Sequence, residues 1–303
     1  MPEYPEVSLY LHALRARILG ERLEAVRIRS PSLLKSFDPA IAHAYGKGVE
    51  SLSRLGKRVV IGLEDDLFLV IHLMIAGRFQ WRKPSAPIPR KRGHAAFDFA
   101  CGTLLLTEAS SHKRASLHLV RGTRALHALD PGGIEPLEAT AREFAAALRR
   151  ENRTLKRALT DPRILSGIGN AHSDEILLRA RLSPVQLTSR LSDPEIERLR
   201  AATQASLREW SARLIDEAGD DFPAKVTAFH PAMSAHGKFG EPCSQCGTAI
   251  QRIVYATRET NYCPECQTGG RLLADRALSR LLRQDWPRKL EDLESLKRER
   301  DAG

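Results

Sequence analysis

Four of the five cysteines in this 303-residue chain form two C-x2-C motifs near its C-terminal end. The four are Cys243, Cys246, Cys263 and Cys266, and residues 247–262 separate the two motifs. Two such knuckles place four thiolates at the corners of a tetrahedron, the geometry that Zn²⁺ prefers. Two alternatives stay open: a pair of disulfides, which are rare inside cells, and an iron–sulfur cluster. We expect one structural zinc ion, because four cysteine ligands leave no open coordination position.

The residues between the two knuckles have the pattern of a strand. Residues 251–255 alternate between polar and apolar side chains, which is the two-residue period of a half-buried β-strand. This segment therefore predicts a β-hairpin zinc ribbon. The fifth cysteine, Cys101, follows a strand-like run and precedes Gly102. We expect Cys101 to be a small buried residue rather than a nucleophile, since a free cysteine commonly packs like a small hydrophobic side chain.

The chain is basic, with 47 lysines and arginines against 37 aspartates and glutamates, a formal net charge of +10. This excess favours a polyanionic partner, nucleic acid first; the alternative is that the charge only keeps the protein in solution. Hydrophobic residues at 42% and charged residues at 28% indicate a globular chain and exclude disordered and collagen-like classes. No apolar run approaches the ~18 residues of a membrane span, and residues 1–6 do not resemble a secretory signal. We expect a soluble, monomeric protein of the cytoplasm, associated with the nucleoid if the source is bacterial.

The periodicity of apolar residues changes near residues 130–133, from a pattern typical of strands to one typical of helices. The expected strands cover 23–28, 58–63, 67–73, 96–107 and 116–120, and the expected helices cover 5–18, 139–151, 153–160, 172–181, 193–217 and 271–284. The fold class is therefore α+β: a β-rich domain with a leading helix, a helical domain, the ribbon and a charged tail.

Two further segments are candidate contacts with an anion. Residues 166–175, Ser-Gly-Ile-Gly-Asn-Ala-His-Ser-Asp-Glu, contain two glycines that let the backbone turn tightly ahead of a helix. The N-terminus of that helix offers N–H groups to a phosphate, although a plain helix–helix turn is the default interpretation. The basic loop at 82–92, interrupted by prolines and without an acidic residue, ends at Arg92; such loops are often simply solvated.

These motifs occur in an order that is more specific than any one of them. A Pro-Glu-x-Pro-Glu start at 2–6, a lysine in the glycine turn at 55–58, the Gly-Ile-Gly-Asn-x-x-x-Asp-Glu segment at 167–175 and the ribbon ending at Gln267 follow one another. Together they resemble the formamidopyrimidine-DNA glycosylase/endonuclease VIII (Fpg/Nei) family of base-excision repair enzymes over residues 2–267.

The resemblance implies the domain organisation and the partner. We expect an N-terminal β-sandwich at 1–130, a helix–two-turn–helix domain at 131–235, a zinc finger at 236–270 and a charged helical tail at 271–303. The implied partner is double-stranded DNA with damaged bases or abasic sites, bound in the cleft between the two lobes. The implied activity is that of a bifunctional DNA glycosylase/AP lyase, which removes oxidised bases and then cleaves the strand.

The start of the chain carries the implied chemistry. Removal of Met1 would expose the secondary amine of Pro2. An α-amino group titrates near ~7.7–8.0, against ~10.4 for lysine, and a helix starting behind it lowers that value further. The neutral amine can attack the anomeric carbon of a damaged nucleotide and form an iminium, with Glu3 as the general acid for the sugar oxygen. The alternative is a plain N-terminal arm.

The resemblance assigns further residues one by one. Lys57 matches the family's β-hairpin lysine, a phosphate contact and proton donor, and Lys156 matches a DNA-contacting lysine ahead of the helix–two-turn–helix motif. Asn170 matches the asparagine that holds the DNA backbone. Arg258 matches the zinc-finger arginine that binds phosphate and acts in δ-elimination. Arg92 is a further candidate DNA contact.

Two segments depart from the family pattern. The family's His-Leu-Gly-Met-Ser-Gly segment reads His-Leu-Met-Ile-Ala-Gly at 72–77, which puts Ile75 at the position of the wedge that fills the space of a flipped base. The alternative wedge residue is Met74. An Asp-Pro-Arg-Arg-Phe-Gly-like loop is replaced at 107–114, where Lys113 and Arg114 match the arginines only with an insertion. We expect a preference for oxidised purines. The alternatives are an enzyme for oxidised pyrimidines or abasic sites, a non-catalytic DNA-damage-binding protein, and a zinc-ribbon RNA or ribosome factor.

Overall fold

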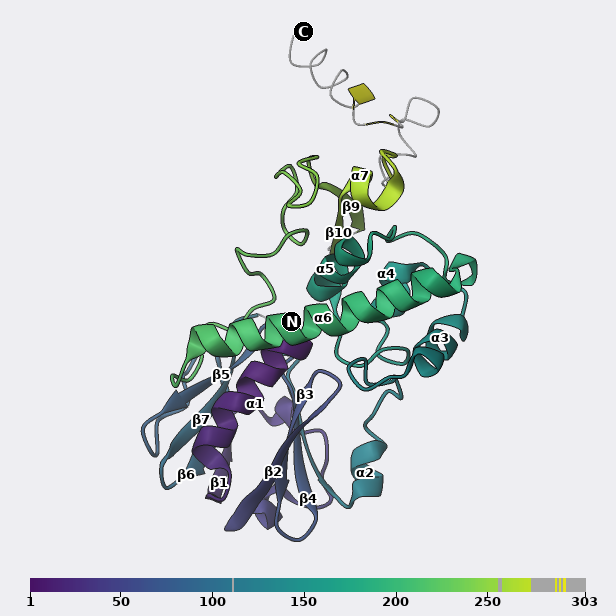
Figure 1. The fold of residues 1–303 in the computed structure, drawn as a ribbon. Helices are drawn as coiled ribbons and strands as arrows, with labels where there is room; N and C mark the ends of the chain where they lie inside the picture. The colour runs from purple at the N-terminus through teal and green to yellow at the C-terminus, as the bar shows by residue number, and fades with distance from the viewer. Residues whose placement is uncertain (111, 256–257, 274–286, 288, 290, 293–303) are drawn as a thin grey trace. The chain divides into compact units, whose positions relative to one another are not determined.

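The computed structural model describes the chain except residues 111, 256–257, 274–286, 288, 290 and 293–303. The chain forms two compact units (Figure 1). Unit 1 contains Met1–Gly133 and Leu207–Ala228, and unit 2 contains Ile134–Ser206 and Phe229–Gly303. Most of the expected tail helix at 271–284 lies outside the described residues. None of the helices in the described part of the chain combines the length and apolar character that crossing a membrane requires.

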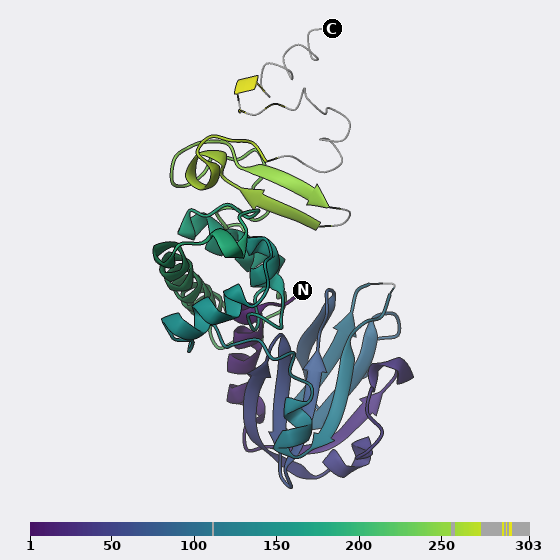
Figure 2. The same ribbon diagram turned by 90° about the vertical axis from the view of Figure 1, so that its right-hand side faces the viewer.

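Unit 1 contains a leading helix and an eight-stranded antiparallel sheet that folds into two layers (Figure 2). The elements are α1 (Tyr4–Ile18), β1 (Arg22–Ile28), β2 (Lys47–Leu55), β3 (Arg58–Leu63), β4 (Leu67–His72), β5 (Gly77–Arg82), β6 (Gly93–Phe99), β7 (Gly102–Glu108), β8 (Ser116–Arg121) and α2 (Thr123–His127), with the short 3-10 helices Pro31–Leu33 and Ile41–Ala44. One layer has the order β5-β7-β6-β1 and the other β2-β3-β4-β8. A short β1–β2 pairing, Arg22 with Gly48 and Leu23 with Lys47, joins them. The expected β-rich domain with a leading helix is confirmed.

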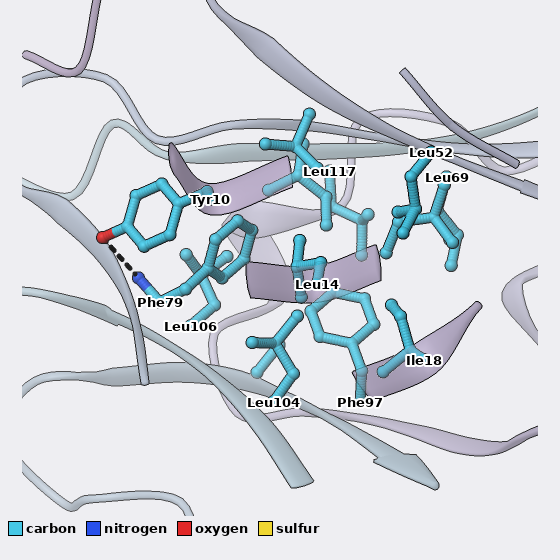
Figure 3. Packing of buried hydrophobic residues seen from close by; sticks show 14 of the residues in the cluster. Tyr10, Leu14, Ile18, Leu52, Leu69, Phe79, Phe97, Leu104, Leu106 and Leu117 are labelled. Carbon is cyan, nitrogen blue, oxygen red and sulfur yellow. Dashed lines mark hydrogen bonds between the residues drawn. The ribbon is translucent and has the colours of Figure 1, made fainter. Parts of the chain in front are cut away.

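Apolar residues of α1 and of both layers form one core (Figure 3). Leu14 and Ile18 of α1 are fully buried, and each such side chain contributes about 1.5–3 kcal/mol by burial. Tyr10 lies edge-on to Phe79, with 5.2 Å between ring centroids, and its hydroxyl accepts a hydrogen bond from the Phe79 N–H at 3.2 Å. This packing fixes the middle of α1 against β5.

Unit 2 contains short helices and the cysteine-rich ribbon. Its elements are α3 (Ala141–Arg149), α4 (Leu155–Thr160), α5 (Asn170–Ala180), the 3-10 helix Thr188–Arg190, β9 (Gln251–Tyr255), β10 (Arg258–Tyr262) and α7 (Pro264–Thr268). The long helix α6 (Asp193–Ala218) begins in this unit. Thr140 caps α3, accepting the Glu143 N–H while the Glu143 carboxylate accepts the Thr140 N–H, a reciprocal pair that starts a helix firmly. The ribbon hairpin expected at 251–255 is confirmed.

Three local expectations need correction or extension. Cys101 is exposed, because it lies in the two-residue turn between the paired residues Phe99 and Gly102. The expectation of a buried Cys101 was therefore wrong. The single run expected at 96–107 is two strands separated by that turn. The runs named in the sequence included neither β2 nor β5, and helix α2 was not expected; Gly77–Arg82 mixes polar and aromatic residues, and Thr123–His127 spans little more than one turn.

Candidate active site and nucleic-acid interface

The start of the chain in unit 1 is buried and tightly hydrogen-bonded. Pro2 is buried, Glu3 is 3% exposed and Glu6 is 2% exposed. Glu3 is the N-cap of α1, and its N–H donates to Glu6 Oε2 at 2.8 Å, half of a capping box in which the Glu3 side chain accepts the Glu6 N–H. Because a capping box holds its two carboxylates in fixed positions, both acids have a defined place beside Pro2.

The surroundings of the amino terminus lower the pKa of an amine at this position. Burial is the largest influence and lowers the pKa of the Met1 amino group; the Glu3 carboxylate opposes this shift, and the charge of Arg78 adds to it, as does the more weakly acting Lys57. An amine whose pKa lies below its ordinary value of 8.0 is neutral in a larger fraction of molecules near neutral pH. The site therefore favours a nucleophilic amine.

Lys57 lies in the tight turn between β2 and β3. Leu55 pairs with Arg58, so Gly56 and Lys57 are the two central residues of the hairpin turn. Gly56 has φ +62° and Lys57 has an ordinary negative φ, which defines a type II′ turn, with its positive φ at the first central position. Arg54 Nη1 donates to the Gly56 carbonyl at 2.7 Å, and the Arg54 guanidinium lies 4.0 Å from the centre of the Tyr4 ring.

The segment after β4 projects an apolar side chain. Ile75 is 59% exposed, and Met74 next to it has φ +55°, a conformation that costs energy in a residue with a side chain. Arg78 Nη1 donates to the Gly77 carbonyl at 2.6 Å and more weakly to the Ile75 carbonyl at 3.3 Å. Gly77 is required there, because a Cβ would lie 2.1 Å from the Leu73 carbonyl oxygen. The loop is thus built to hold Ile75 outward.

His72, at the end of β4, stands beside this loop. Burial, followed by the positive charges of Arg58 and Lys57, lowers the pKa of His72 to about 4. The imidazole is therefore neutral at physiological pH. No role was predicted for His72 from the sequence, although it directly precedes the segment that carries Ile75.

The segment that replaces the family's arginine-rich loop is organised by Glu108. The Glu108 carboxylate accepts the N–H of Arg114 and of Ala115 at 3.0 and 3.2 Å and lies 2.9 Å from Nε2 of His94, with both side chains 1% exposed. Lys113 Nζ donates to the carbonyl of Glu108 at 3.0 Å. Lys113, expected to contact DNA, therefore stabilises its own loop. Lys113 and Arg114 are both exposed, and Arg114 is the arginine that this loop presents to solvent.

A small cavity of about 230 Å³ opens between the loop that carries Ile75 and the segment after Glu108. Its lining residues are Ala76, Arg78, Gln80, Pro89, Arg92, Thr107, Ala109 and Ala224. The two arginines and Gln80 supply hydrogen-bond donors, whereas the alanines and proline supply flat apolar walls. Arg92, expected to contact DNA, thus lies on a cavity that can accept a planar group with several acceptor atoms.

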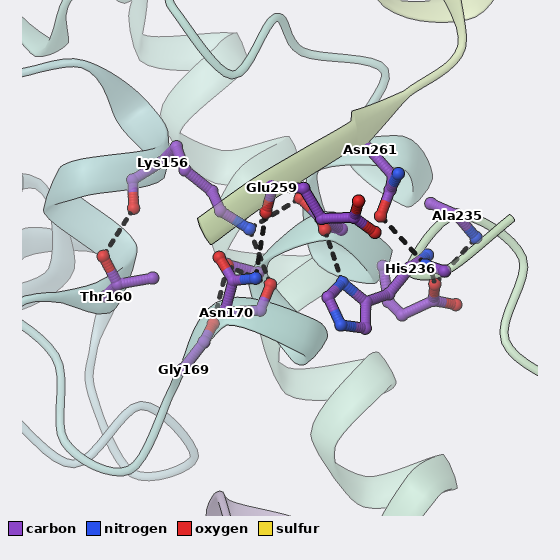
Figure 4. A network of polar contacts seen from close by, with 12 residues as sticks. Lys156, Thr160, Gly169, Asn170, Ala235, His236, Glu259 and Asn261 are labelled. Carbon is purple, nitrogen blue, oxygen red and sulfur yellow. Dashed lines mark hydrogen bonds and ion pairs between the residues drawn. The ribbon is translucent and has the colours of Figure 1, made fainter. Parts of the chain in front are cut away.

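In unit 2, Lys156 and Asn170 lie together at the start of α5 (Figure 4). Lys156 Nζ bonds to the Asn170 carbonyl and to Asp174 Oδ1, both at 2.6 Å. Asn170 Nδ2 donates to the carbonyl of Glu259 in β10 at 2.9 Å. Asp174 is fully buried and also bonds to His236 Nδ1 at 2.8 Å. The two residues expected to hold DNA therefore also fasten α5 to α4 and to the ribbon hairpin.

A neighbouring carboxylate fixes the segment that leads into the ribbon. Glu175, 8% exposed, accepts the backbone N–H groups of Ser234, Ala235 and His236 at 2.9, 2.8 and 2.9 Å. The Gln267 amide donates to the Leu182 carbonyl at 2.9 Å. The ribbon is therefore bonded to both ends of α5. Arg258, the expected phosphate-binding arginine, begins β10 beside Glu259; its side chain lies outside the description.

The four ribbon cysteines fit a tetrahedral metal site. The sulfur atoms of Cys243, Cys246, Cys263 and Cys266 all lie within 4.8 Å of one another, and the four are free thiols rather than disulfides. The N–H of Gln245 points to Cys243 Sγ and that of Cys266 to Cys263 Sγ, each at 3.4 Å, as expected where thiolates are held by backbone knuckles. A set of four thiolates is the ligand set of structural zinc, and these cysteines would hold one ion.

The structure thus places Pro2, Glu3 and Lys57 in unit 1 and Lys156, Asn170 and the cysteines in unit 2. Sequence reasoning missed the acids that organise these groups, Glu6, Glu108, Asp174 and Glu175. Three of these acids, Glu6, Asp174 and Glu175, belong to the sequence motifs that carry the family resemblance. What each bonds to depends on contacts far along the chain, and no local pattern gives these.

Family models and known proteins match the chain over most of its length. The formamidopyrimidine-DNA glycosylase N-terminal domain matches residues 1–121, the helix–two-turn–helix domain of the same enzymes matches 133–212, and the zinc finger found in these enzymes and in IleRS matches 240–269. The chain is 30% identical to the formamidopyrimidine-DNA glycosylase of Ligilactobacillus salivarius over 279 residues, covering 88% of this chain and 99% of the relative. The corresponding Desulfitobacterium hafniense protein is 32% identical over 275 residues, with coverage of 88% and 100%.

Solved structures agree with these matches. The Lactococcus lactis enzyme bound non-covalently to DNA with an abasic site superimposes with a TM-score of 0.76 at 26% identity, covering 88% of this chain and 99% of that one. The same enzyme in complex with DNA containing an oxidised pyrimidine gives a TM-score of 0.77 at 28% identity, with coverage of 88% and 100%. The three domain models in their expected order, the 30–32% identity over whole relatives and the shared fold show that the chain belongs to the formamidopyrimidine-DNA glycosylase/endonuclease VIII family.

Proposed function

We propose that this protein, a DNA glycosylase of base-excision repair, removes oxidised bases through a covalent intermediate on Pro2 and then cleaves the strand. The observation that carries the proposal is the buried amine site at the start of α1, where burial and nearby cations lower the pKa of the amino terminus. Two buried carboxylates, those of Glu3 and Glu6, face the same short segment. Removal of Met1 would make Pro2 the nucleophile.

The first stage forms the iminium. The neutral Pro2 nitrogen attacks C1′ of the damaged nucleotide, the bond from C1′ to the base breaks, and the base leaves with a proton from Lys57. Glu3 protonates the ring oxygen O4′, the sugar opens, and the nitrogen loses its proton as the C=N bond forms. Glu6 holds the N–H of Glu3 and so orients the general acid.

The second stage cleaves the strand. The iminium acidifies the C2′ proton, whose loss expels the 3′ phosphate by β-elimination. A further proton loss expels the 5′ phosphate by δ-elimination, with Arg258 as the proton donor. Water then hydrolyses the iminium and restores Pro2.

The partner is duplex DNA with a damaged base or an abasic site, bound where the chromosome lies, in the cytoplasm. Relatives supply the support, because the Lactococcus lactis enzyme has been solved with DNA that contains an abasic site, Fapy-dG or an oxidised pyrimidine. We place Ile75 in the gap left by the extruded nucleotide, with Lys57, Lys156, Asn170 and Arg114 on the phosphates. We assign the extruded base to the cavity that Arg78 and Arg92 line, whose donors fit the carbonyl oxygens of an oxidised purine.

One observation favours a second candidate, an enzyme for oxidised pyrimidines or abasic sites. In the loop after Glu108, the Lys113 ammonium bonds to the Glu108 carbonyl and the Arg114 N–H bonds to the Glu108 carboxylate. The loop therefore presents one arginine, where the family has two arginines and a phenylalanine. An altered loop at this place would change the response to the base opposite the lesion.

Borohydride trapping tests the catalytic proposal. Duplexes with 8-oxoguanine, formamidopyrimidine, thymine glycol, dihydrouracil or an abasic site, each opposite all four bases, are incubated with enzyme and reductant. We expect the wild-type protein to form a covalent adduct with at least one lesion. Pro2→Gly should form less of this adduct, and Glu3→Gln should no longer excise the base. Because glycine at position 2 also permits removal of Met1, the Pro2→Gly variant differs from the wild type in its N-terminal amine and not in whether Met1 is removed. Absence of an adduct with every duplex, or retention of Met1 in the mass of the purified protein, would refute the proposal.

A further inference from the structure

We propose that Arg54 is a positioning residue that holds the Lys57 turn against the catalytic start of α1. The inference rests on the proposed function, since it concerns how Lys57 and the Pro2–Glu3 segment stay in one arrangement. It is carried by two contacts of a single guanidinium: a hydrogen bond to the carbonyl of Gly56 at 2.7 Å and a stacking contact with the Tyr4 ring at 4.0 Å.

The first contact selects one conformation of the turn. The Gly56 carbonyl belongs to the central peptide of the type II′ turn, directly before Lys57. Rotating this peptide by half a turn would convert the turn to type I′, which requires a positive φ at both central residues. Lysine adopts that conformation at a cost. The Arg54 hydrogen bond adds to this cost and so fixes the direction in which the Lys57 side chain leaves the hairpin.

The second contact ties the turn to the helix that carries the nucleophile. Tyr4 is the first residue of α1, and it directly follows Glu3. A guanidinium over an aromatic ring contributes about 0.5–1 kcal/mol at exposed sites and more where water is excluded; both side chains here are half-buried. The contact therefore restrains the end of β2 relative to the first turn of α1, two residues from Pro2.

The chain offers a matched comparison at the other end of the same helix. Arg15 Nη2 donates to the Leu52 carbonyl at 2.8 Å, so it also joins α1 to β2, about 16 Å along the helix from Tyr4 at 1.5 Å per residue. If Arg54 merely stabilised the packing of α1 on β2, Arg15→Ala and Arg54→Ala would have the same consequences. If Arg54 positions the site, only its loss should slow the chemistry.

The experiment is single-turnover kinetics with full-length protein on a duplex that carries the oxidised base giving the strongest adduct, measuring adduct formation by borohydride trapping and binding by fluorescence anisotropy. We expect Arg54→Ala to slow adduct formation by about 10- to 100-fold, the range that small misplacements of reacting groups cause, with less than a threefold change in Kd. Tyr4→Leu should slow it in the same direction, Tyr4→Phe should keep the wild-type rate because the ring remains, and Arg15→Ala should keep the rate while lowering Tm.

The outcomes separate this inference from the proposed function. A wild-type protein that forms no adduct refutes the proposed function. A wild-type protein that forms the adduct while Arg54→Ala or Tyr4→Leu forms it at the same rate refutes the positioning role alone. Equal slowing by Arg15→Ala and Arg54→Ala also refutes it, since the effect would then follow stability. Should Arg54→Ala fail to fold, the Tyr4→Leu and Tyr4→Phe pair decides the question.

Discussion

Replacing Glu175 by alanine removes the acceptor that three consecutive backbone N–H groups share. Ser234, Ala235 and His236 donate to the carboxylate at 2.8–2.9 Å, and Glu175 is 8% exposed. Hydrogen bonds to a charged group contribute about 1.5–3 kcal/mol each. Because the three bonds share one carboxylate and the freed N–H groups can reach water after local opening, we expect a loss of about 3 kcal/mol in the local opening free energy.

Hydrogen–deuterium exchange of residues 234–236 measures this loss directly. A change of about 3 kcal/mol corresponds to exchange about 100-fold faster at these three amides, since each 1.4 kcal/mol is tenfold. Glu175→Gln, which keeps one acceptor oxygen, should lie between alanine and wild type. Glu241→Ala is the matched control, because Glu241 makes an exposed ion pair with Lys238 at 2.8 Å of a kind worth about 0–1 kcal/mol. Unchanged exchange in Glu175→Ala, or equal acceleration in Glu241→Ala, would show that the carboxylate does not hold this segment.

Two further predictions concern the ribbon and pH. Cys263→Ser should release the zinc and unfold the ribbon, because structural zinc supplies much of the folding energy of such small units. A colorimetric zinc assay should find about one ion per chain in the wild type and in the control Cys101→Ser. An equal zinc content in Cys263→Ser would contradict this prediction. The pKa of His72 is about 4 in the folded protein against an ordinary 6.5 in the unfolded chain, so only the unfolded chain takes up this proton between these values. The free energy of unfolding should therefore fall as pH drops from 6.5 to 4, and it should fall less steeply in His72→Gln. Urea titrations at pH 7, 6 and 5 measure this free energy at each pH. The same dependence of the free energy on pH in wild type and His72→Gln would refute the prediction. His94 and His118, whose pKa values burial also lowers, contribute to the decline that remains.

Features set by neighbours in the sequence were predictable. The spacing of the four cysteines gave the zinc site because two knuckles need no information from the rest of the chain. The helix expected at 193–217 is α6, Asp193–Ala218, since its apolar residues repeat at the helical period over many turns. Cys101 was misjudged because a strand followed by glycine does not show on which side of the turn a residue falls.

Features set by distant neighbours were not predictable in the same way. Asn170 and the Glu259 carbonyl are 89 residues apart in the chain, and the partners of Glu175 lie about 60 residues away. A lysine in a polar loop suggests a solvent-facing or phosphate-binding side chain, yet Lys113 bonds to the carbonyl of Glu108, because that loop folds over a buried carboxylate. A buried acid of this kind is rare enough that composition gives no warning of it.

The ribbon of unit 2 is attached to α5 largely through main-chain atoms. Asn170 bonds to the Glu259 carbonyl, Gln267 to the Leu182 carbonyl, and Glu175 to three N–H groups. Every amino acid except proline offers both of these backbone groups. Substitutions other than proline at the half-buried Ser234 and Glu259 would therefore leave these bonds in place, so the surface around the hairpin is free to diversify during evolution while its anchorage stays the same.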